Sequence, residues 1–202
     1  MPSIPTKKLK TDKVTDMHAM FYYCKSLEQL DLNGFNTINT TNMSSMFSDC
    51  TKLKKISFGT DFSTENVTST SFMFCNCEGL TQIDLSTFNT HNVTNMSAMF
   101  DGCIRLERFD ISDHVTDFDT RNVTNMSAMF SHCETLTELD LSHFNTSQVT
   151  NMANMFNRCA KLTTIKLENF DTRNVKKMNG MFNSCAKLAN VDVSHFDTHN
   201  VT

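Results

Sequence analysis

The sequence predicts an α/β repeat protein, a solenoid of seven stacked coils with one parallel β-sheet on one side and short helical turns on the opposite side. The pair Met-Phe recurs seven times, at spacings of 26, 27, 26, 30, 26 and 26 residues. A unit of about 26 residues cannot bury its apolar face alone, so neighbouring units must stack. The 202 residues also include 17 Phe and 14 Met, as a repeated core requires. We number the repeats 1 to 7 by these pairs: Met20-Phe21, Met46-Phe47, Met73-Phe74, Met99-Phe100, Met129-Phe130, Met155-Phe156 and Met181-Phe182.

The first half of each repeat has the spacing of a short helix. The apolar residues of repeat 4 fall at i, i+3, i+4 and i+7, which is one face of a helix: Met96, Met99, Phe100 and Cys103. The Thr-Asn pair just before Met96 can cap the first amides. We therefore expect a helical turn in each repeat.

The second half of each repeat has the pattern of a strand. In repeat 5, Leu136, Leu139 and Leu141 follow the spacing L-x-x-L-x-L, and the last two alternate as in a strand. Stacked repeats would place these strands side by side at about 4.8 Å in a parallel sheet.

Three columns of identical residues fill the predicted core. One column is Leu27, Leu53, Leu80, Leu106, Leu136, Leu162 and Leu188. A second is Phe35, Phe62, Phe88, Phe118, Phe144, Phe170 and Phe196, with Leu9 in the same slot before repeat 1. Seven of the eight Cys form a third column, three residues after the Phe of each Met-Phe pair. We interpret the Met, Phe and Cys as core filling rather than as a redox, copper or cofactor site, and we expect reduced thiols.

Thr and Asn form further columns, which include Thr146 and Asn174. These side chains are suited to pair with backbone groups where each coil bends, because a buried bend cannot leave its amides and carbonyls unpaired.

The string MF-x-x-C-x-x-L-x-x-L-D-L-S-x-F-x-T-x-N-V-T-N-M resembles the 26-residue repeat of bacterial surface proteins, a branch of the BspA-like leucine-rich repeats. The resemblance extends from about Leu9 to Thr202. It implies a leucine-rich-repeat solenoid on the bacterial cell surface or secreted, which binds host proteins or other cells. No catalytic residue belongs to the motif.

Strand alternation predicts an exposed, acidic face. With Leu30 and Leu32 inward, residues 29, 31 and 33 and their equivalents project outward. Across the three outward columns we count seven acids and three bases, a net charge of -4 that equals the formal net charge of the chain. The candidate partner-binding residues on this face are Asp31, Asp84, Arg108, Asp110, Glu138, Asp140, Lys166 and Asp192.

Two interpretations of this acidic column remain open. The face could contact a basic patch on a partner or gather divalent cations. Alternatively, each Asp, commonly followed two residues later by Ser, simply bonds the turn after its strand. Like charges stacked at strand spacing repel one another, so something should offset them.

Length changes between repeats fall on one loop edge. The segment from Phe58 to Phe62 has one extra residue, and the segment from Ile111 to Phe118 has four. The loops near Thr60 and at Asp113 to Thr116 are therefore additional contact candidates, although a tolerated, solvated bulge is the commoner explanation.

Several classes of function are disfavoured. The mild net charge argues against nucleic-acid binding, and no apolar run approaches the roughly 20 residues of a membrane-spanning helix. We find no phosphate loop, nucleophile elbow or zinc-spaced set of His and Cys, so we expect no enzyme activity, cofactor or metal. The favoured function is a non-enzymatic protein-binding or adhesion module. The alternatives are a structural spacer or stalk and a cytoplasmic recognition protein.

The two ends raise separate expectations. Residues 1–8 form a short basic lead-in without the apolar stretch of a secretion signal, and residues 9–202 form a single solenoid. If Met1 is the natural start, the cytoplasmic alternative is favoured. Neither end carries a polar capping repeat. We therefore expect either a piece of a longer surface protein or association of chains end to end.

Overall fold

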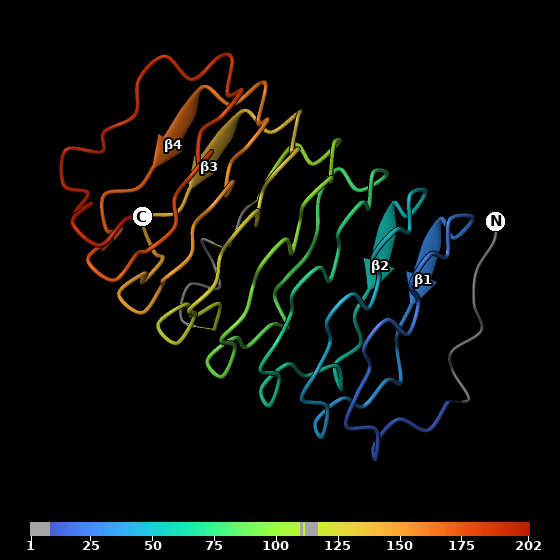
Figure 1. Cartoon of the computed structure of the whole chain (residues 1–202). Coiled ribbons are helices and arrows are strands. Elements are labelled where there is room, and N and C mark those ends of the chain that lie inside the picture. Colours follow the sequence, from blue (N-terminus) through green and yellow to red (C-terminus); the bar gives the residue numbers. More distant parts are fainter. Residues whose placement is uncertain (1–8, 110, 112–116) are drawn as a thin grey trace.

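The computed structural model describes residues 9–109, 111 and 117–202, so the lead-in, Asp110 and the whole loop at Asp113 to Thr116 lie outside the described residues. The repeats stack side by side into a solenoid, with repeat 1 at one end and repeat 7 at the other (Figure 1). This confirms the predicted repeat solenoid, while the predicted sheet and helical turns need correction.

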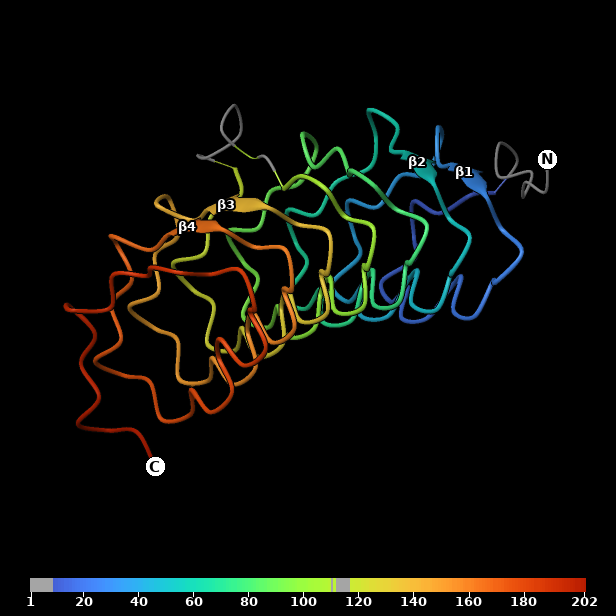
Figure 2. The ribbon, with the colours of Figure 1, turned by 90° about the horizontal axis from the view of Figure 1, so that it is seen from above.

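The strands are short and form two separate parallel pairs. Strands β1 (Gln29–Asp31) and β2 (Lys55–Ser57) pair with Leu30 opposite Ile56. Strands β3 (Glu138–Asp140) and β4 (Thr164–Lys166) pair with Leu139 opposite Ile165. All four lie along one long side of the solenoid (Figure 2). The prediction of one continuous sheet is wrong, because repeats 3 and 4 contribute no regular strand among the described residues.

A second ladder, made of single bridges, runs through the stack without a break, unlike the interrupted strand pairs. Single parallel bridges join each repeat to the next just before its Met-Phe turn, and their residues are Asp16, Asn42, Ser69, Asn95, Asn125, Asn151 and Lys177. This ladder continues across the gap between the two strand pairs. The stacking of repeats therefore depends on the turns rather than on the sheet.

The predicted helical turns are wrong, and no helix occurs in the part of the chain that the structure describes. An α-helix directs each N–H to the carbonyl four residues earlier. Here the Met99 N–H donates to Met96 O at 3.3 Å, which closes a β-turn, whereas the Phe100 N–H donates to Met129 O of the next repeat at 2.9 Å. Alternate amides thus close a turn within the repeat or join two repeats.

Positive φ angles turn these amides toward the neighbouring repeat. In repeat 4 they occur at Ala98 (φ 52°) and Gly102 (φ 75°). The same two positions have positive φ in every repeat, and their non-glycine residues are Ala19, Tyr23, Ser45, Asp49, Phe72, Asn76, Ala98, Ala128, His132, Asn154, Arg158 and Ser184. Each such residue costs of order 1 kcal/mol in backbone strain. At Gly102 a Cβ would also collide with Oδ1 of Asn76, so the Asn76 side chain would have to move to admit another residue.

The inward side chains form continuous columns, as predicted. Six successive pairs of Phe rings from Phe21 to Phe182 are stacked, with centroids 5.4 to 6.2 Å apart and planes within 17°. All eight Cys are free thiols, and Cys159 Sγ donates to Phe130 O at 3.1 Å. Burial raises the pKa of Cys50 to about 12, which keeps the thiol protonated. Leu9 and Met20, in contrast, are 44% and 42% exposed and lie outside the core.

The Thr and Asn columns bond the bends of neighbouring repeats, which confirms their expected task. Thr146 Oγ1 donates to Asp171 O at 3.0 Å and accepts the Asp171 N–H at 2.7 Å. Asn174 Nδ2 donates to Ser147 O at 2.7 Å. These bonds join repeats on the edge between the strands and the turns.

A glycine substitution at a positive φ position distinguishes a turn from a helix by the sign of the change in stability. We expect Ala128→Gly, at φ 54°, to leave stability unchanged or raise it by up to about 1 kcal/mol, because glycine adopts this region without strain. Urea unfolding measures the effect. In a helix the same change would cost about 1 kcal/mol.

Ala153→Gly is the matched control, since Ala153 follows the bridge residue Asn151 and has no positive φ. It should destabilise the protein through the entropy of glycine in the unfolded chain. A loss of stability at Ala128 as large as at Ala153 would contradict the turn geometry.

Candidate interaction face

The strands present an exposed face of polar side chains. In β1 and β3 the central leucine is buried, and the flanking residues, among them Asp31, Glu138 and Asp140, are exposed. Lys166 is exposed in β4, whereas Asp84, Arg108 and Asp192 are exposed on segments without regular strand structure. Asp110 lies outside the described residues. The predicted residues thus share one side of the solenoid, but they do not form one regular ribbon.

Each described Asp of the column bonds the turn that follows it. Oδ1 accepts the N–H two residues later: Asn33 to Asp31, Ser86 to Asp84, Ser142 to Asp140 and Ser194 to Asp192, at 2.9 to 3.0 Å. The local interpretation of the Asp column, that it stabilises turns, is confirmed. One carboxylate oxygen of each Asp is therefore committed to the backbone.

An ion pair offsets part of the like-charge repulsion. Lys166 Nζ donates to Asp140 Oδ2 at 2.7 Å, directly across the parallel pair β3 and β4. This hydrogen bond, with one from Ser142, lowers the pKa of Asp140 from 3.8 to about 2. Both side chains remain about half exposed, so water and salt screen their attraction.

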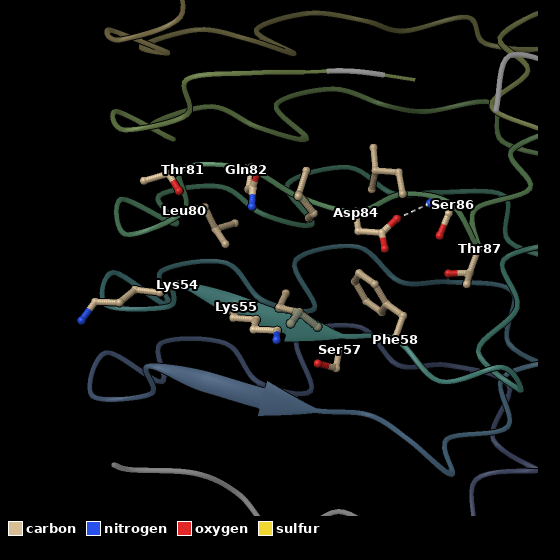
Figure 3. A pocket seen from close by; sticks show the side chains of 13 residues that line it. Lys54, Lys55, Ser57, Phe58, Leu80, Thr81, Gln82, Asp84, Ser86 and Thr87 are labelled. Atoms are coloured by element: carbon tan, nitrogen blue, oxygen red, sulfur yellow. Dashed lines mark hydrogen bonds between the residues drawn. The ribbon is translucent and has the colours of Figure 1, made fainter. Parts of the chain in front are cut away.

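Two grooves open between repeats on the strand side. The first seam lies between β2 with its flanks (Lys54–Phe58) and the segment Leu80–Thr87, and has a volume of about 670 Å³ (Figure 3). The second seam, with a volume of about 540 Å³, is lined on one side by residues 107–109 and Ile111 and on the other by residues between Thr137 and His143. No backbone hydrogen bond joins β2 to Leu80–Thr87, and both stretches are fully described. The same repeats remain bonded through their turns, where Phe47 N–H donates to Met73 O at 2.9 Å.

An additional phenylalanine lies beside each seam. Phe58 occupies a column that holds Leu32, Leu85 and Leu141 in other repeats, and its ring reaches Phe88 of repeat 3 at 5.2 Å. Phe109 occupies the column of Leu30 and Leu139, and its ring reaches Phe130 of repeat 5 at 4.9 Å. A Phe is larger than the residues at the same position of other repeats, and each of these two rings packs against the next repeat beside its seam.

Sequence reasoning missed the seams, although it contained a signal for them. The two additional Phe fall in repeats 2 and 4, which also carry the extra residues after the strand position. The wall of the first seam contains a buried polar atom without a hydrogen-bond partner, Oγ1 of Thr87. Such an atom costs about 1 to 3 kcal/mol.

The described residues offer no other chemical centre. No group of three or more His, Cys, Asp or Glu among them is placed to hold a metal ion. No helix in the same residues could cross a membrane.

Three overlapping segments, residues 3–78, 51–138 and 107–202, match the family described as "Mycoplasma protein of unknown function, DUF285". The chain belongs to this family. No curated protein matches the sequence.

Comparison with solved structures identifies the fold. A leucine-rich repeat protein from T. pallidum is 21% identical with a TM-score of 0.57, and the alignment covers 93% of this chain and 77% of that one. A leucine-rich repeat protein from Eubacterium ventriosum is 17% identical with a TM-score of 0.41, covering 89% and 36% of the two chains. The first likeness shows the leucine-rich-repeat fold, and the resemblance to BspA-like repeats drawn from the motif is confirmed.

The pair across β3 and β4 can be tested by titration. We expect Lys166→Met to raise the pKa of Asp140 from about 2 toward 3.8, because the Lys166 hydrogen bond is the largest cause of the shift. The lowered pKa stabilises the fold above pH 3.8 and this contribution is lost as the pH falls through about 2. Acid unfolding of Lys166→Met should therefore begin at a higher pH.

Carboxyl NMR titration measures the pKa directly. Lys55→Met is the control, since Lys55 lies on β2 and does not contact Asp140. An unchanged Asp140 pKa in Lys166→Met would assign the shift to Ser142 instead.

Proposed function

We propose that this chain is a non-enzymatic protein-interaction module that binds its partner through the strand face. The observation that supports this most strongly is that the stacking contacts and the exposed polar side chains lie on different parts of each repeat. The turn ladder joins all the bridged repeats, whereas the strand pairs are interrupted and their outward side chains are exposed. Side chains on the strand face can therefore vary to suit a ligand without loss of stacking, as in other repeat proteins.

The proposed contact residues are the charged side chains of this face, within a single domain of residues 9–202. Asp110 is included because of its column position. The face has more acids than bases, so a partner with a basic patch is favoured. The residues are Asp31, Asp84, Arg108, Asp110, Glu138, Asp140, Lys166 and Asp192.

A location on the bacterial surface is part of the proposal and is supported by the repeat motif. A spacer without ligands and a cytoplasmic recognition protein are the competing functions. Ligand selection separates the first of these from a binding module, because a spacer selects nothing.

Selection from a random peptide display library tests the binding function. We expect enriched peptides rich in Lys and Arg, whose binding falls about tenfold when Asp31, Asp84, Asp140 and Asp192 are replaced by Asn. Asn keeps the side-chain oxygen that accepts the turn N–H, so the substitution removes charge while the turn is retained.

The chain offers a matched control at four other Asp that bond turns in the same way. These are Asp16, Asp119, Asp171 and Asp197. Their replacement by Asn should leave binding unchanged. No enrichment, or an equal loss in both sets of variants, would refute binding through the strand face.

A second candidate property, association of chains end to end, is favoured by the hydrogen bonds of the outermost repeats. Interior turns donate to the next repeat, as Phe156 N–H does to Met181 O at 2.9 Å. Among the described residues, the Phe182 N–H of repeat 7 donates to no backbone carbonyl, and the Met20 carbonyl of repeat 1 accepts no backbone N–H. An apolar cavity of about 490 Å³ at repeat 7 includes Val193, which is 40% exposed. Repeat 1 of a second copy is complementary in hydrogen bonding to this surface.

Light scattering over a range of concentrations tests this association. We expect the mass to rise with concentration, and Val193→Glu to hold it at that of a monomer, because a charge would be buried in the contact. Thr164→Glu, on the exposed strand face, is the control. A monomer mass for the unmodified chain at every concentration would exclude end-to-end assembly.

A further inference from the structure

We propose that the first seam is a binding site for an extended, acidic peptide segment of a partner protein, which adds a strand to the open edge of β2. The inference deepens the proposed function and rests on it, because the seam lies within the strand face. It names the mode of recognition and the charge of the segment that enters the seam, which is opposite to the charge of the basic patch that the Asp column favours elsewhere on the strand face.

The edge of β2 offers the backbone groups that such a strand needs. Toward repeat 1, β2 is paired, with Lys54 N–H donating to Glu28 O and Leu32 N–H donating to Ser57 O, both at 2.9 Å. Toward repeat 3, where Leu80–Thr87 would continue the sheet, no backbone hydrogen bond crosses. An unpaired strand edge accepts an extended peptide through main-chain bonds. The edge from Lys54 to Phe58 is five residues long, or about 16 Å.

The floor of the seam is apolar and incompletely covered. Ile56 and Ile83 are half-buried, whereas their counterparts Leu30 and Leu139 are 1% and 2% exposed. Phe58 is also half-buried and lines the seam. Alternate side chains of a docked strand would point at this floor and remove its apolar surface from water.

Charges at the rim select an acidic ligand. Lys54 and Lys55 stand where β2 begins, and Asp84 lies toward the other end (Figure 3). Lys54 pairs with Glu28 at 3.1 Å, whereas Lys55 has no ion pair among the described residues. An acidic side chain beside Lys55 would complete this end of the seam.

The second seam has the opposite character, which makes it a built-in comparison. Its walls include Glu107, Glu138 and Asp140, with Arg108 as a counter-charge. An acidic peptide is repelled there, so it is directed to the first seam.

The stack can accept a strand at this place because its turns hold the repeats together. Repeats 2 and 3 keep their turn bonds, among them Asp49 N–H to Cys75 O at 2.8 Å. We attribute the opening on the strand side to the Phe58 ring, which packs against Phe88 of repeat 3. A peptide therefore enters a groove that is already formed and does not have to break a sheet.

A labelled synthetic peptide, Glu-Glu-Thr-Val-Thr-Val-Thr-Val, is the probe, and fluorescence anisotropy measures its affinity. We expect saturable binding that weakens about tenfold in Lys55→Glu, and a peptide with Lys in place of both Glu should show the reverse preference. Proline at alternate Val positions of the probe should abolish binding, because proline removes the donated N–H groups.

Phe58→Leu restores the residue type of the column and should close the seam, so the probe no longer binds. Phe109→Leu makes the same change beside the second seam and should leave the affinity within about twofold, since distant sites act independently. Lys55 is exposed, so Lys55→Glu retains the fold and keeps the test valid if Phe58→Leu does not.

The outcomes separate this inference from the proposed function. The seam proposal is overturned by absence of saturable binding up to about 1 mM, by unchanged binding to Phe58→Leu in a folded protein, or by equal binding of the proline peptide. If the library still selects ligands that depend on the Asp column, the interaction function stands without the seam. If neither experiment detects a ligand, both are refuted.

Discussion

The hydrogen bonds between neighbouring tight turns are the interaction on which the rest of this structure depends. They form because two residues in every repeat take a positive φ, which turns alternate amides out of the repeat and toward the next one. The strain at twelve non-glycine residues is offset by bonds that each repeat makes to its neighbour, by stacked Phe rings and by buried Met and Cys. One repeat alone would bear the strain without this compensation, so the turns are stable only as a stack.

Because the turns hold the stack, the strand side has more freedom. Among the described residues, strands pair between repeats 1 and 2 and between repeats 5 and 6. The two grooves lie at unpaired junctions beside Phe58 and Phe109. The result is a leucine-rich-repeat solenoid with a continuous turn side and a strand side divided by grooves. The Asp column has two roles on the strand side, since one carboxylate oxygen stabilises the turn that follows the strand position and the charge remains at the surface.

Much of this could be predicted from sequence, and the failures have physical causes. Spacing alone identified the repeat, the Phe and Leu columns and the task of residues such as Thr146, because stacking makes identical positions equivalent. It mistook the turns for helices, since residues at i, i+3, i+4 and i+7 also face inward in successive β-turns. Gly102, Asn76 and Asp49 in one column were a usable signal, because these residue types favour positive φ. The seams depend on ring size in single repeats, which a consensus pattern averages away.

Native-state amide hydrogen exchange tests most directly whether the turns, rather than the sheet, hold the repeats together. If the turns hold the repeats together, the amides of Phe47, Phe74 and Phe100, which bond the next repeat, exchange only on global unfolding. The amides of Phe58 and Ile83, beside the first seam, should exchange orders of magnitude faster without unfolding. Equal protection at Phe58, Ile83 and the three turn amides would contradict the account, because it would show a closed, continuous sheet that shares the load.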